Sequence, residues 1–133
     1  MKRTTIFKIL TLLYIVVVAV ICFARFSSLP TVPGKFLWFD ADKVVHFLMF
    51  VPFPVLAFYS FPLDRKRLFP TLGAIILIFA IGAALAGLTE FIQGRLPYRT
   101  MDINDYKADV LGLLFSSLVV FLVRVFSHKS ANA

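Results

Sequence analysis

The segment Leu68–Thr89 reads LFPTLGAIILIFAIGAALAGLT and contains no charged residue between Arg67 and Glu90. The hydrocarbon core of a bilayer is about 30 Å thick, and a helix needs roughly 20 apolar residues to cross it. This segment therefore predicts a transmembrane helix. The composition agrees, because 60% of the 133 residues are hydrophobic and the mean hydropathy is +0.90. A soluble domain of this size has too much surface to hide so many apolar side chains.

Three further apolar runs, Ile6–Ala24, Val44–Leu63 and Val110–Val123, repeat the pattern. The first follows a basic start, as in a signal peptide, but it is long and lacks a small-x-small cleavage site, so we expect it to be retained. The last reaches spanning length only with its polar flanks. We predict an all-α membrane protein, a four-transmembrane-helix bundle in one domain (1–133), with spans at about 6–24, 44–63, 68–92 and 105–126.

Basic residues favour an orientation with both termini in the cytoplasm. With four spans, the N-terminus, the loop 65–67 and the C-terminal tail share one side, and they hold more lysine and arginine than the two opposite loops. The side richer in these residues usually faces the cytoplasm. The net charge of +7 fits basic loops that face anionic lipid, so we expect membrane lipids and no nucleic acid as partners. We expect the segment 25–42, which contains Trp38, to lie along the opposite membrane surface.

Polar residues gather where the second and fourth spans begin and the third ends, which places them at one membrane face. Each charge is costly near hydrocarbon unless it is paired. We therefore expect one polar cluster, with Asp42 as the N-cap of the second span and Arg99 paired with Glu90 or Asp105. The residues of this predicted polar cluster are Asp42, Lys43, His46, Glu90, Gln93, Arg99, Asp102, Asp105 and Asp109.

Small residues lie below the acids of the third and fourth spans at helical spacing. Such residues let membrane helices approach closely. We predict that these two spans pack tightly and that their acids point into the bundle. The small residues on the contact stripes are Gly82, Gly87, Gly112 and Ser116.

Several motifs follow one another along the polar cluster: Asp-Lys-x-x-His-Phe, then Glu-x-x-Gln, then an Arg with an Asp six residues on, a polar residue four beyond and a Gly three further. The positions that form these motifs are Asp42, Lys43, His46, Phe47, Glu90, Gln93, Arg99, Asp105, Asp109 and Gly112. Over roughly residues 40–120 the chain resembles the VanZ family of small bacterial membrane proteins. It departs from the family pattern at Asp109, where an asparagine is usual, and at Ser116, where a glycine is usual.

The resemblance implies a multi-pass protein of the bacterial cytoplasmic (inner) membrane. Members of the family are associated with resistance to glycopeptide antibiotics such as teicoplanin, by a route that is not well defined. The resemblance therefore supplies no reaction, and the function has to be argued from the polar cluster.

Two classes of function are the main candidates. We favour a non-enzymatic membrane factor that binds a lipid headgroup, an amphiphile or a partner membrane protein, because arginine with mixed acids suits a zwitterionic or phosphate-bearing headgroup. The alternative is an intramembrane enzyme for a lipid-linked substrate, with His46 as general base, Asp42 orienting it and Arg99 facing the developing anion.

A metal site of His46, Glu90 and Asp105 has weak support, because a lone histidine with scattered carboxylates is poor ligand evidence. We therefore expect no metal and no cofactor. Transport is a third possibility, and it would require a homo-oligomer to enclose a path.

Reporter fusions test the orientation. A fusion after Lys129 should report a cytoplasmic location, and a fusion within 31–37 should report the opposite side, because the basic ends and the loop 65–67 share the cytoplasmic face. An external location for the C-terminal fusion would contradict the N-in, C-in arrangement.

Overall fold

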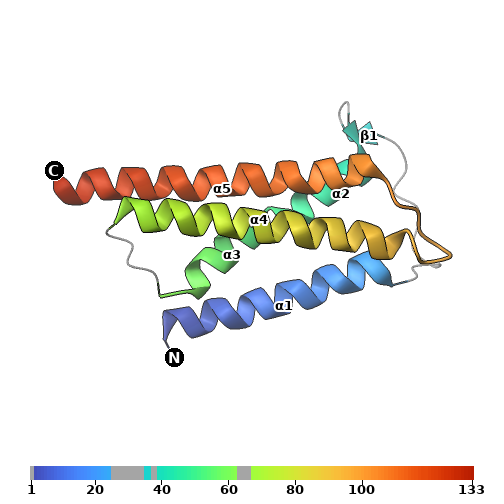
Figure 1. The fold of residues 1–133 in the computed structure, drawn as a ribbon, viewed down its shortest axis with the longest axis horizontal. Coiled ribbons are helices and arrows are strands. Elements are labelled where there is room, and N and C mark those ends of the chain that lie inside the picture. Colours follow the sequence, from blue (N-terminus) through green and yellow to red (C-terminus); the bar gives the residue numbers. More distant parts are fainter. Residues whose placement is uncertain (1, 25–34, 37–38, 63–66) are drawn as a thin grey trace.

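The computed structural model describes residues 2–24, 35–36, 39–62 and 67–133, which are almost entirely helical (Figure 1). The elements are α1 (Arg3–Phe23), β1 (Lys35–Phe36), β2 (Phe39–Asp40), α2 (Ala41–Phe50), α3 (Pro52–Ser60), α4 (Leu68–Gln93) and α5 (Ile103–Asn132). The two short strands pair antiparallel. They belong to the segment expected along the membrane surface, most of which lies outside the described residues.

Four helical segments are long and apolar enough to cross a membrane, namely Arg3–Phe23, Ala41–Ser60, Leu68–Gln93 and Ile103–Asn132. The predicted all-α class with four spans is confirmed. The fourth helix is longer than the predicted span, because it continues through the polar residues on both sides of its apolar run. Figure 1 shows both termini at the end of the bundle opposite the connection between α4 and α5.

The second span is divided at Val51, where α2 ends and α3 begins. Pro52 is the first residue of α3, and Pro54 follows it. Proline lacks a backbone N–H and its ring clashes with the preceding turn, so it interrupts or kinks a helix. Val51 keeps helical angles, φ −55° and ψ −41°, and the chain therefore continues in the same general direction.

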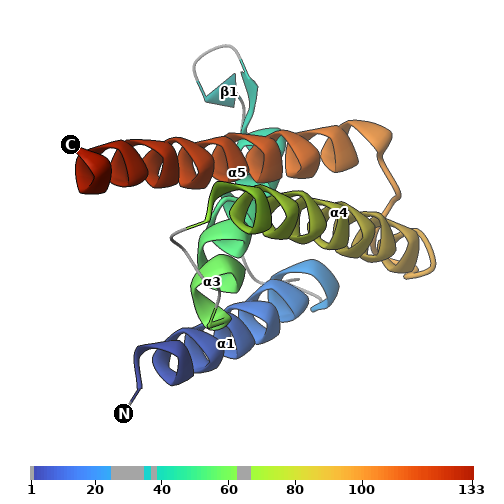
Figure 2. The same ribbon diagram turned by 60° about the vertical axis from the view of Figure 1, so that its left-hand side comes forward.

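This division lets one span contact two sides of the bundle. α2 packs mainly on α5, α3 packs mainly on α1, and α4 and α5 lie along each other (Figures 1 and 2). The shared core includes Phe50, Phe53, Phe58 and Leu113. α1 is the most peripheral helix, with large apolar side chains such as Leu12 turned outward, at 64% exposure. In a bilayer this surface faces lipid.

The small residues act at different interfaces. A Cβ at Gly82 would lie 2.7 Å from Leu113 of α5, which fits the predicted contact between α4 and α5. A Cβ at Gly112 would overlap the backbone oxygen of Phe47, so the face of α5 that carries Gly112 packs on α2, whereas the adjacent Leu113 contacts α4. Gly87 has ordinary room, with the Tyr106 ring 3.6 Å away. Ser116 is buried one turn beyond Gly112.

Replacing Gly112 by Ala should lower thermal stability, whereas replacing Gly73 by Ala should not. Alanine has the higher helix propensity at both positions. At Gly112, however, its Cβ overlaps a backbone atom that cannot rotate away, and overpacking typically costs about 1–3 kcal/mol. Among the described residues, no atom lies within 4 Å of a Cβ at Gly73. Circular dichroism melting in detergent measures both, and equal shifts would contradict the close approach of α2 to α5.

Candidate functional site

The polar cluster is formed where three helices meet at one end of the bundle. His46 lies on α2, Glu90 in the last turn of α4, and Asp105 and Asp109 in the first two turns of α5. All four residues are buried, and Asp109 is 0% exposed. The structure thus brings together side chains that are far apart in the sequence.

Both ring nitrogens of His46 face carboxylates. Its Nδ1 lies 2.9 Å from Asp109 Oδ1 and 3.8 Å from Glu90 Oε1, and its Nε2 lies 3.5 Å from Asp105 Oδ2. Asp105 and Asp109 can reach the same ring because residues four apart lie on one face of a helix. A histidine with both nitrogens engaged has a fixed ring orientation, which suits it to hold a proton or a ligand.

Lys43 is the cation that the structure places against the acids of α5. Its Nζ lies 2.7 Å from Asp102 Oδ2, 3.5 Å from Asp42 Oδ2, and within ion-pair distance of Asp105 Oδ1. The hydrogen bond from Lys43 lowers the pKa of the Asp102 carboxyl below its ordinary range, and the backbone N–H of Asn104 adds to this effect. Asp102 is also the N-cap of α5.

Two of the roles predicted for Asp42, the N-cap of the second span and the orientation of His46, belong to other residues. α2 begins at Ala41, and its N-cap is Asp40, because the helix starts before the apolar run at Val44. The Asp42 side chain is 65% exposed. The carboxylate hydrogen-bonded to His46 is that of Asp109. Any acid–base chemistry of His46 would therefore depend on Asp109 for orientation.

The predicted pairing of Arg99 with Glu90 or Asp105 is wrong. Arg99 Nη2 donates instead to the carbonyl oxygens of Ile21 at 2.9 Å and Ala24 at 3.4 Å. The connection between α4 and α5 directs Arg99 toward the end of α1, and Lys43 takes the place predicted for Arg99 beside Asp105. The nearby Arg95 lies over the Phe91 ring, 4.9 Å from its centroid.

Three side chains from this region bind the end of α1. Gln93 Nε2 donates to the Cys22 oxygen at 3.0 Å, and the Tyr98 hydroxyl donates to the Phe23 oxygen at 2.6 Å. With Arg99 they contact the carbonyls of 21–24, which are the groups that a helix C-terminus leaves without intrahelical partners. Gln93 and Arg99 therefore link the polar cluster to α1.

Two carboxylate oxygens in the cluster lack a hydrogen bond. Among the residues that the structure describes, Glu90 Oε1 and Asp109 Oδ2 are buried without a hydrogen-bond partner. The other oxygen of each is engaged, by the backbone N–H of Asp102 and by His46 respectively. Two sets of side chains offer atoms close enough to share a cation: Asp42, His46 and Asp105, and His46, Glu90 and Asp109.

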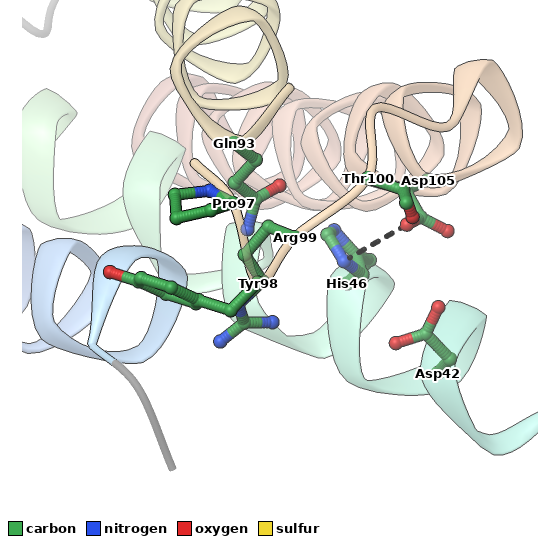
Figure 3. A pocket seen from close by; sticks show the side chains of 8 residues that line it. All are labelled: Asp42, His46, Gln93, Pro97, Tyr98, Arg99, Thr100 and Asp105. Atoms are coloured by element: carbon green, nitrogen blue, oxygen red, sulfur yellow. Dashed lines mark ion pairs between the residues drawn. The ribbon is translucent and has the colours of Figure 1, made fainter. Parts of the chain in front are cut away.

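A cavity of about 450 Å³ opens beside His46 (Figure 3). In Figure 3, Arg99 and Asp42 lie on different sides of His46, and Asp105 lies close to the ring. The residues that line the cavity are Asp42, His46, Gln93, Pro97, Tyr98, Arg99, Thr100 and Asp105. Pro97, Tyr98 and Thr100 were not among the predicted site residues. Their position in the short segment between two spans was the only feature of the sequence that could have indicated them.

Comparisons with known proteins agree with the motif analysis. A model of the VanZ/LLP1 family matches residues 5–124. Over 89 residues the chain is 33% identical to the uncharacterized protein C11E3.10 of Schizosaccharomyces pombe, an alignment that covers 66% of this chain and 49% of the relative. The chain thus spans about half the length of that relative. No solved structure matches this chain significantly.

Replacing Lys43 by Gln should destabilise the bundle, because Asp105 would remain buried without its cation. We expect a loss of about 1–3 kcal/mol, between the values for exposed and buried pairs, since the Lys43 side chain is 24% exposed. Lys107→Gln is the matched control, because Lys107 is exposed on the same end of α5. Unfolding in detergent gives both values. If the two variants lose equal stability, Lys43 is not the compensating cation.

Proposed function

Because this chain belongs to the VanZ/LLP1 family and has four helices able to cross a membrane, we propose that it is a non-enzymatic membrane protein that binds the zwitterionic headgroup of a lipid or similar amphiphile. The headgroup occupies the cavity beside His46. Residence in a bacterial cytoplasmic membrane and a link to glycopeptide resistance belong to the same proposal, and they rest on the family resemblance alone.

The observation that carries the proposal is the mixed charge of the cavity. Arg99 lines it together with Asp42 and Asp105. A guanidinium is a planar donor suited to phosphate, and an exposed carboxylate such as Asp42 suits an ammonium group. A phosphate and an ammonium group on one headgroup would meet partners of opposite sign within a single cavity.

A second, apolar cavity supports an amphiphile over a free headgroup. It has a volume of about 180 Å³, and apolar side chains of α1, α3 and α4 line most of it, among them Val18, Phe53 and Leu88. Ile92 lines this cavity and the adjacent Gln93 lines the polar one. In this proposal the headgroup binds in the polar cavity and part of an acyl chain binds in the apolar one.

An intramembrane enzyme is the second candidate, and the 2.9 Å contact between His46 Nδ1 and Asp109 Oδ1 favours it. A carboxylate in that position fixes the ring and stabilises the imidazolium that forms when the other nitrogen accepts a proton. This candidate predicts that the bound lipid changes mass during incubation, whereas the binding protein leaves it unchanged.

Native mass spectrometry of the detergent-purified chain with added phosphatidylethanolamine tests the proposal. The wild type should bind phosphatidylethanolamine better than diacylglycerol, which has the chains but no headgroup. Arg99→Gln should weaken binding by about 10- to 100-fold, since a charged hydrogen bond contributes about 1.5–3 kcal/mol. Asp42→Asn should weaken binding too. Because Asp42 is exposed, this change should not disturb the packing of the bundle.

Arg95→Gln is the matched control, because Arg95 lies in the same connection but does not line the cavity. Equal binding of phosphatidylethanolamine and diacylglycerol would refute the headgroup proposal. So would equal weakening by the Arg95 and Arg99 substitutions. A change in the mass of the bound lipid would support the intramembrane enzyme instead.

A further inference from the structure

The buried part of the polar cluster holds more carboxylates than Lys43 pairs with. Lys43 is engaged by Asp102 and Asp105. That leaves Glu90 and Asp109 facing His46, with side chains that are 2% and 0% exposed. Two carboxylates in a low-dielectric interior are strongly unfavourable unless they are compensated.

The unpaired oxygens indicate where the missing charge would be. Glu90 Oε1 and Asp109 Oδ2 are the two oxygens without a hydrogen-bond partner among the described residues. Glu90 Oε1 is directed at His46, 3.8 Å from Nδ1. One ligand atom from each of His46, Glu90 and Asp109 lies within 4.8 Å of the others.

We propose that His46, Glu90 and Asp109 form a binding site for a divalent transition-metal cation such as Zn²⁺ or Mn²⁺. With a neutral imidazole, the two carboxylates carry the charge that a divalent cation neutralises. The imidazole nitrogen favours these metals over Mg²⁺ and Ca²⁺, which prefer oxygen ligands. The site does not depend on the lipid proposal.

The distances suit such a site. Ligand atoms about 2.1 Å from a tetrahedral metal are about 3.4 Å apart. The distances from His46 Nδ1 to Asp109 Oδ1 and Glu90 Oε1, 2.9 Å and 3.8 Å, lie on either side of that value. Small side-chain adjustments within the three helices would therefore be sufficient.

The second ring nitrogen of His46 has a carboxylate beside it, as metal-bound imidazoles usually do. Nε2 lies 3.5 Å from Asp105 Oδ2, and Lys43 holds that carboxylate in place. When a metal replaces the hydrogen bond between Nδ1 and Asp109 Oδ1, the ring proton lies on Nε2, where the Asp105 carboxylate faces it. Asp105 is thus a positioning residue and not a ligand in this assignment.

The alternative set, Asp42 with His46 and Asp105, is less suitable. Asp42 is exposed, and water already solvates its charge. Asp105 already has Lys43 as its cation. Substitution of Asp42 tests the alternative set, and substitution of Glu90 or Asp109 tests the proposed set.

The test uses the full chain in detergent, stripped with chelator and titrated with Co²⁺ or Zn²⁺. The wild type should bind one equivalent, measured by elemental mass spectrometry, with visible Co²⁺ absorption, and its melting temperature should rise with metal concentration. His46→Gln, Glu90→Gln and Asp109→Asn should each weaken binding by more than about 100-fold, because even residues behind the ligands typically change affinity 10–100-fold.

Two controls keep the result specific. His128→Gln removes the chain's other histidine, which bonds to Asn132 at the far end of α5, and it should retain binding. Asp42→Asn should also retain it. Misfolding is not expected for Asp109→Asn, because without metal the change removes an uncompensated buried charge, and its melting temperature should equal or exceed that of the metal-free wild type.

Three results would overturn the assignment. One is the absence of metal binding by the wild type. Another is loss of binding in Asp42→Asn with retention in Asp109→Asn, which would assign the metal to the other set. The third is a melting temperature of the wild type that does not respond to metal but changes with pH, while that of Asp109→Asn does not change with pH. This result would indicate that the acids share a proton instead of binding a metal.

Discussion

Lys43 and His46 lie about one turn apart on α2 and face the acids at the start of α5. Burying either the basic side chains of α2 or the acidic side chains of α5 at the end of an apolar bundle would be strongly unfavourable without the other set. The arrangement therefore fixes the relative height of the two helices, because a shift by one turn would separate Lys43 from Asp105 and His46 from Asp109. The other contacts of the cluster follow from this alignment.

The packing of the apolar core and the geometry of the site depend on one close approach. Gly112 lies one turn after Asp109, and the backbone that it contacts is that of Phe47, the residue after His46. The missing side chain at Gly112 is what lets α2 come near enough for His46 to meet Asp109. The proline-induced division of the second span contributes as well, since it lets α2 follow α5 while α3 packs on α1.

Much of the fold could be predicted from the sequence, because apolar runs of spanning length have few alternatives in structure. Membership of the polar cluster was also predictable, since charges are expelled to the ends of spans and four spans bring these ends to one face. Partner choice was not predictable in the same way. It depends on the path of the connection after Gln93, which directs Arg99 to α1, and on the rotation of α2, which turns Lys43 toward α5 and leaves Asp42 exposed. The earlier start of α2, with Asp40 at the N-cap position, was not predictable because polar flanks give no hydrophobic pattern.

The bonds from Gln93, Tyr98 and Arg99 to the carbonyls of 21–24 have a consequence for biogenesis. α1 is synthesised before the other three spans, yet the side chains that bind its C-terminal end follow more than 70 positions later. α1 packs mainly on α3, so it can associate with the second span as soon as that span has been inserted. Its C-terminal end gains these hydrogen bonds only after the third span has followed. The contacts at this end of α1 are therefore completed late, once the connection between α4 and α5 has been synthesised.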